Sequence, residues 1–168
     1  MATFQANSIN IGTGGTIDVG DVTLTDKGAL QGRVAFAAMQ NGTGSGNNST
    51  NGVQIFQTEH VDTHNAYNNS TGIFIAPVAG VYFFYASLMG SSSDTRRAHY
   101  ISKSTDGGSN WSYLVQFGGQ AKNYNQFTTS VVSSLNANDQ VSVRNSSYAC
   151  SLYTNCNQEA VFGGYLIG

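Results

Sequence analysis

The residues best placed to do chemistry lie in residues 59–64, where His60, Asp62 and His64 alternate along the chain. Alternate residues of an extended segment point to one face, and imidazole and carboxylate groups are metal ligands. The segment runs directly into residues 65–70, which are rich in Asn and Ser and are typical of a solvated turn. We therefore predict no metal site and no cofactor.

A second candidate is the octapeptide Ser-Thr-Asp-Gly-Gly-Ser-Asn-Trp at residues 104–111, which resembles an Asp-box turn. An aspartate at this place bonds to the backbone of its own turn, while glycine supplies positive φ angles. We expect Asp106 to hold a hairpin and Trp111 to pack beneath it. The motif is interpreted as structural.

No arrangement of nucleophile and base is evident. Ser, His and Asp residues are present, but there is no G-x-S-x-G elbow, and paired acidic residues are sparse. Arg96 and Arg97 could pair with acidic partners or anionic sugars, although an exposed strand entry explains them equally well. We predict a protein that is not an enzyme, with no catalytic residues.

Composition excludes two classes of partner. Only 10% of the residues are charged, and 7 Lys and Arg against 9 Asp and Glu give a net charge of −2. Without a basic run, the phosphate-neutralising surface of a nucleic-acid-binding protein is missing. No apolar run approaches the ~20 residues that span a bilayer. We expect neither nucleic acid nor membrane as a partner.

The elements that must position these residues are short strands. Runs of β-branched and aromatic residues are separated by Gly, Asn and Asp turns, and no segment carries a helical stripe. Pro77, the only proline, ends one run because it has no N–H to donate. Strands are predicted at residues 33–40, 53–58, 73–76, 80–88, 97–104, 111–117, 126–135, 139–144, 148–153 and 161–167. This pattern predicts an all-β sandwich or jelly roll.

Residues 81–86, Val-Tyr-Phe-Phe-Tyr-Ala, organise the prediction, because they are apolar on both faces. Residues 33–39 and 161–167 share this property, so we expect the three segments to neighbour one another in one buried sheet. A sandwich covers only one face of each sheet. A second copy of the chain is the most economical cover for the other face.

Residues 1–32 form a separate region, followed by one globular domain at residues 33–168. Short alternating apolar pairs between Gly-rich breaks predict an extended β-arm that leans on another surface. This segment lacks the positive and apolar regions of a secretory signal, so we expect synthesis and folding in a cytoplasm. Cys150 and Cys156 could close a hairpin by a disulfide or remain free thiols.

The domain resembles the globular heads of the complement C1q and tumour-necrosis-factor superfamily. The resemblance is carried by the string Thr-Gly-x-Phe-x-Ala-Pro-x-x-Gly-x-Tyr-x-Phe at residues 71–84 and by the ending Phe-Gly-Gly-Tyr-Leu-Ile at residues 162–167. It implies a ten-stranded jelly roll, a homotrimer formed through an aromatic inner sheet, and a role in adhesion rather than catalysis. For the trimer interface we predict Phe36, Val81, Phe83, Tyr85, Tyr165 and Ile167.

The chain carries neither a Gly-X-Y collagen stem nor a secretion signal ahead of this domain. A trimeric head with a Gly- and Asn-rich β-arm resembles phage virion proteins, namely capsid decoration or cement proteins and head or tail fibres. We therefore predict a capsid decoration protein on the virion, anchored through residues 1–32 to the major capsid protein or another virion protein.

An alternative role is the tip of a tail fibre or another adhesion module. Its loops at residues 41–51 and 91–95 would then bind host glycans. A secreted lectin-like protein ranks below both, because it needs a signal peptide.

Overall fold

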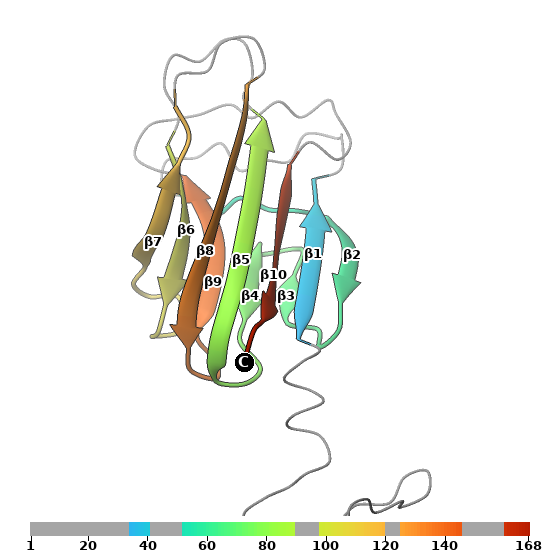
Figure 1. Ribbon diagram of the computed structural model, residues 1–168, viewed down its shortest axis with the longest axis vertical. Helices are drawn as coiled ribbons and strands as arrows, with labels where there is room; N and C mark the ends of the chain where they lie inside the picture. Colours follow the sequence, from blue (N-terminus) through green and yellow to red (C-terminus); the bar gives the residue numbers. More distant parts are fainter. Residues whose placement is uncertain (1–33, 41–51, 90–97, 120–124, 146–159) are drawn as a thin grey trace, which may run out of the picture.

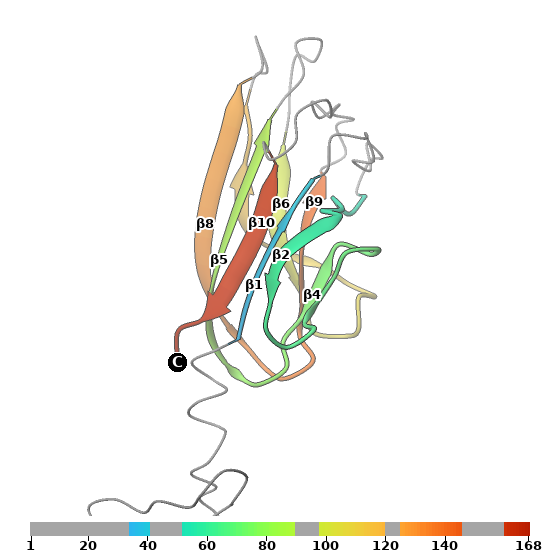
Figure 2. The same ribbon diagram turned by 90° about the vertical axis from the view of Figure 1, so that its right-hand side faces the viewer.

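The computed structural model describes residues 34–40, 52–89, 98–119, 125–145 and 160–168. These residues form two antiparallel five-stranded sheets that face each other (Figures 1 and 2). The predicted all-β jelly-roll class is confirmed. Among the described residues there is no helix long and apolar enough to cross a membrane.

Sheet I has the strand order β2-β1-β10-β5-β8. Its strands are β1 (Ala35–Met39), β2 (Thr58–Asp62), β5 (Gly80–Met89), β8 (Gln126–Leu135) and β10 (Val161–Leu166). The three segments that are apolar on both faces lie side by side as β1, β10 and β5, which confirms the predicted neighbours.

Sheet II has the order β3-β4-β9-β6-β7. Its strands are β3 (Tyr67–Asn68), β4 (Ile73–Ile75), β6 (His99–Ser104), β7 (Ser112–Phe117) and β9 (Gln140–Asn145). In β9, Val141 and Val143 are buried against sheet I, while Gln140 and Arg144 point to the outer side. The valines of this strand therefore face the core, and Gln140 and Arg144 face away from it.

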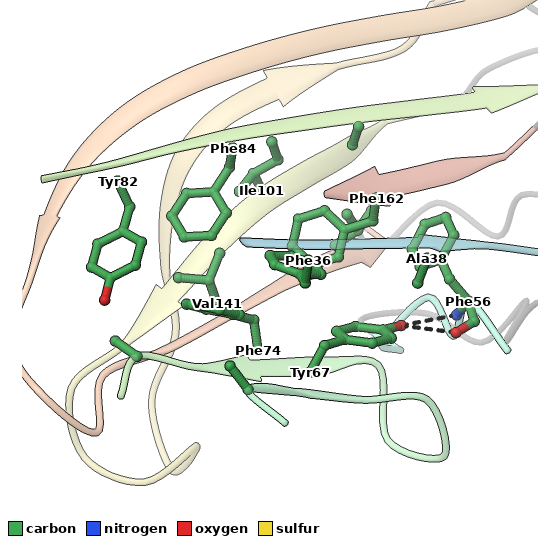
Figure 3. Packing of buried hydrophobic residues seen from close by; sticks show 14 of the residues in the cluster. Phe36, Ala38, Phe56, Tyr67, Phe74, Tyr82, Phe84, Ile101, Val141 and Phe162 are labelled. Carbon is green, nitrogen blue, oxygen red and sulfur yellow. Dashed lines mark hydrogen bonds between the residues drawn. The ribbon is translucent and has the colours of Figure 1, made fainter. Parts of the chain in front are cut away.

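The core between the sheets is aromatic (Figure 3). Phe36 stacks on Phe74 with ring centroids 4.8 Å apart and meets Phe162 edge-on at 4.9 Å. The Tyr67 hydroxyl donates to the Phe56 carbonyl at 3.2 Å and accepts from the Phe56 N–H at 3.1 Å. Burial raises the pKa of Tyr67, so this phenol stays neutral and can do both.

The turn between β8 and β9 brings the two sheets together. Asn138 has φ 73°, a left-handed conformation that Asn adopts more readily than most residues. The Asp139 carboxylate accepts from the Asn136 N–H at 2.9 Å and lies 3.6 Å from the Lys103 ammonium. The Ala76 N–H donates to the Asp139 carbonyl at 2.9 Å, which ties this turn to the end of β4.

Two predictions of secondary structure differ from the observed strands, and a third lies outside the described residues. Residues 53–58 are not a strand: Val53 makes only an isolated bridge to Arg144, and the strand begins at Thr58. The Gln54 N–H donates to the Val143 carbonyl of β9. This segment therefore lies beside β9, just beyond the residues of β9 that pair with β4, and touches it too briefly to form a strand. Residues 67–68, predicted as a turn, form β3. The strand predicted at residues 148–153 lies outside the described residues.

Candidate functional site

The outer face of sheet I is apolar at its centre. Side chains of β5, β8 and β10 that point away from the core form this surface, here called the outer aromatic face, together with Ile167. Its members are Val81, Phe83, Tyr85, Val132, Tyr165 and Ile167. Of these, Tyr165 is 48% exposed and Val132 is 55% exposed. Large apolar side chains gathered on one face are typical of a contact surface.

The register of the strands builds this face. Phe83 lies opposite both Tyr165 in β10 and Val132 in β8. Its ring centroid is 5.3 Å from that of Tyr165 and 6.4 Å from that of Tyr85. A Cβ at Gly163 would lie 2.5 Å from the Tyr85 hydroxyl, so the Tyr85 ring lies over the glycine. Burial raises the pKa of Tyr85.

Towards Met89 the same face becomes polar. Ser87 Oγ lies 3.0 Å from Thr128 Oγ1, and Gln126 Nε2 donates to Ser87 Oγ at 2.9 Å. These side chains bond to one another across β5 and β8. Sheet I therefore presents an aromatic centre beside a hydrogen-bonded polar end.

Five of the six predicted interface residues lie on this outer face, and Phe36 does not. Phe36 is 3% exposed in the single subunit, and its ring lies in the core against Tyr67 and Phe74. The prediction for Phe36 is wrong because β1 points its even-numbered residues inward, and small Ala35 and Ala37 occupy its outer side.

The histidines and aspartate at residues 60–64 are dispersed by the turn that follows β2. The Asp62 carboxylate accepts from the backbone N–H groups of His64, Ala66 and Tyr67 at 3.2, 2.9 and 2.9 Å. His64 Nδ1 lies 2.8 Å from the Thr63 hydroxyl. Within the described part of the chain, no three His, Cys, Asp or Glu side chains are grouped as metal ligands. Asp62 stabilises a turn.

The predicted Asp-box hairpin is confirmed. Asp106 accepts from the Asn110 N–H at 2.8 Å, from the Asn110 side-chain amide at 2.6 Å and from the Ser104 hydroxyl at 2.8 Å. These bonds from Asn110 and then Ser104 lower the pKa of Asp106 to about 2. Trp111 Nε1 donates to the Gly108 carbonyl at 2.9 Å, so the indole closes the turn.

A cluster on the outer face of sheet II was not predicted. The Tyr100 and Tyr113 rings are stacked with centroids 3.9 Å apart, and the Arg144 guanidinium carbon lies 4.6 Å from the Trp111 ring centroid. Partial burial lowers the pKa of Arg144, with nearby Tyr113 acting in the opposite direction. The available signal was the outward parity of Arg144 in an alternating strand, but its partners come from other strands.

Other candidates lie outside the described residues. These are Arg96 and Arg97, Cys150 and Cys156, the loops at residues 41–51 and 91–95, and the arm at residues 1–32. The directions of the described strands show at which end of sheet I the chain leaves or enters some of these segments. β1 and β5 are both antiparallel to β10, so Met39 and Met89 lie at one end of sheet I and Val34 at the other. Figure 1 shows the arrowheads of β1 and β5 at the same, upper end of sheet I.

Comparison with known proteins places the chain. The C1q domain profile matches residues 35–167. The globular domain of zebrafish complement 1qA protein is 19% identical with a TM-score of 0.61, the match covering 80% of this chain and 96% of that one. Eiger TNF from S. frugiperda is 14% identical with a TM-score of 0.67, covering 80% and 92%. Murine APRIL is 14% identical with a TM-score of 0.59, covering 77% and 95%. The search of curated protein sequences found no match. The chain belongs to the C1q domain family.

Proposed function

We propose that this protein is a homotrimeric, non-enzymatic structural module in which the outer aromatic face of each subunit packs against its neighbours. The observation that carries the proposal is that face: Phe83, Tyr85 and Tyr165 gather on a sheet surface that the described residues of the subunit leave partly exposed. Full burial of each large apolar side chain contributes roughly 1.5–3 kcal/mol. Rotational symmetry lets one face serve every contact.

The test is a single charge on that face. In Phe83→Asp, subunit contact would bury an unpaired carboxylate, which costs about 3–5 kcal/mol. Light scattering should give the wild type three times the subunit mass of 17.8 kDa and the variant 17.8 kDa. Tyr113→Asp places the same charge on the outer face of sheet II and should remain trimeric. A monomeric wild type, or a trimeric Phe83→Asp, contradicts the proposal.

The setting we propose is the surface of a virion, where the protein decorates or cements the capsid. Two features support this role. Residues 1–32 carry alternating apolar pairs among Gly and Asn, as expected of an arm that adds strands to a partner. The described domain begins at Val34, at the end of sheet I opposite Met39 and Met89. An anchor at one end would leave the other end pointing outward.

Deleting residues 1–32 tests the capsid role. We expect the truncated protein to keep its trimeric mass but to disappear from purified particles, because the anchor is gone and the interface is not. A truncated protein that still occupies particles at the wild-type level contradicts anchoring by this segment.

A second candidate function is receptor binding at the tip of a fibre. It is favoured by the direction of the strands in sheet I. β1 and β5 finish at the same end of the sheet, and the chain continues from them into residues 41–51 and 90–97. The truncated trimer distinguishes the two roles. Binding of this trimer to host cells supports the receptor role, while absence of binding together with lost particle occupancy supports decoration.

A further inference from the structure

The outer face of sheet II carries a second group of aromatic side chains, on the side of the sandwich opposite the outer aromatic face. Cross-strand partners place Arg144 beside Tyr100, and Ser142 beside Ser102. Tyr113 lies opposite Ser102 in β7. Partners in a sheet point to the same side, so these side chains form two adjacent rows on one surface.

Aromatic rings at this face are held in place. Tyr113 is 58% exposed, although its ring stacks on Tyr100 at 16° between the ring planes. One side of the Tyr113 ring is thus supported, and the ring remains largely accessible. Trp111 is fixed by its bond to Gly108 and carries the Arg144 guanidinium on its ring. These contacts hold the rings of Tyr113 and Trp111, here called the platform together with Tyr100 and Arg144.

Three buried polar atoms of this face have no hydrogen-bond partner among the residues that the structure describes. Ser102 and Ser142 are both fully buried, although they point away from the core, and neither hydroxyl has a hydrogen-bond partner in the described part of the chain. Gln140 Oε1, close to Trp111 across Gly108, is also buried and has no partner among the described residues. Buried polar groups are normally bonded, so these three oxygens show that the layer just below this surface is polar rather than apolar.

We propose that this face binds a carbohydrate, with a pyranose ring stacked on Tyr113 and sugar hydroxyl groups bonded to Arg144. A sugar ring offers an apolar C–H face and a rim of hydroxyl groups. The site offers the same combination, an accessible aromatic ring beside a guanidinium donor.

The site is separate from the proposed subunit interface. It lies on sheet II, whereas the outer aromatic face lies on sheet I. It also differs from the loops of the receptor-binding alternative, since Tyr113 and Arg144 belong to β7 and β9. In a trimer, three copies would face outward and bind a polysaccharide with increased avidity. Monomeric behaviour would overturn the trimer and leave this site intact.

Trp111 is the only tryptophan of the chain, so its fluorescence reports on this face directly. The full-length protein is titrated with maltohexaose, chitohexaose, hexagalacturonate and sialyllactose, which represent neutral, N-acetylated, uronic and sialic sugars. We expect a saturable change of fluorescence with at least one of them. The class that binds shows whether Arg144 meets a hydroxyl or a carboxylate. No saturable change with any of the four up to ~10 mM, the weak limit of useful affinity, overturns the proposal.

Three variants test whether sugar binding depends on the Tyr113 ring and on the Arg144 side chain. Tyr113→Ala removes the ring and should weaken binding about tenfold, whereas Tyr113→Phe keeps the ring and should stay within about twofold. Arg144→Gln should weaken the same sugar about fivefold or more. Thermal unfolding and light scattering verify that each variant keeps its fold and mass. Unchanged affinity in a folded Tyr113→Ala overturns the site.

Discussion

Asp62 shows how a residue suited to metal binding acts in a turn. Its carboxylate holds three backbone N–H groups, and two of them, of Ala66 and Tyr67, belong to buried residues. Asp62→Ala leaves these groups without a partner. We expect a loss of about 1–3 kcal/mol in the free energy of unfolding, measured by urea denaturation. Glu59→Ala, at an exposed neighbouring position, should change it by less than about 0.5 kcal/mol.

Tyr67 is a second residue whose polar atom matters more than its ring. Its hydroxyl bonds to both the N–H and the carbonyl of Phe56 in the core. Tyr67→Phe keeps the stacked ring but leaves two buried groups unpaired, so we expect a loss of about 1–3 kcal/mol in urea denaturation. Tyr82→Phe is the matched control, because within the described residues that hydroxyl makes one hydrogen bond, to the Val78 carbonyl, and a smaller loss is expected. Equal losses would contradict this interpretation.

At the scale of the element, the β6–β7 hairpin depends on one ionised carboxylate. The pKa of Asp106 in the fold, about 2, is lower than its ordinary value of 3.8. A lowered pKa contributes stability that is present above about pH 4 and is lost as the pH falls through about 2. We expect the Asn110 amide to exchange faster at pH 2 than at pH 4, relative to the amide of Ile101. Asp106→Asn should abolish this difference.

Two adjacent glycines of β10 face opposite sides of sheet I, so substitutions at them should have different effects. A Cβ at Gly164 would lie 2.7 Å from the Phe83 carbonyl oxygen and 2.6 Å from the Phe84 ring, and neither can move aside. A Cβ at Gly163 would meet the outer end of Tyr85. Gly164→Ala should lower the free energy of unfolding by about 1–3 kcal/mol. Gly163→Ala should instead displace Tyr85 and weaken the trimer. Both effects are measured by urea denaturation and light scattering, and the reverse order would contradict this assignment.

At the scale of the whole molecule, the proposed assembly depends on apolar burial rather than on ion pairs. No charged side chain is among the members of the outer aromatic face. Salt screens charge interactions but does not weaken apolar burial. We expect the light-scattering mass to be the same at about 0.05 M and 1 M NaCl. Dissociation at high salt would contradict this prediction and show that charged residues outside the outer aromatic face hold the subunits together.

The sequence alone determined the class of fold, the adjacency of β1, β10 and β5, and the turn that Asp106 holds by hydrogen bonds. These depend on local chemistry: β-branched and aromatic runs, one proline, and an aspartate that bonds within its own turn. Only the tertiary structure decided which residues of the doubly apolar strands point inward. Such strands have no alternation, so the sequence carries no signal that separates Phe36 from Phe83. The Tyr113–Arg144 platform is likewise a product of pairing among β6, β7 and β9, because its side chains become neighbours only across strands distant in the chain.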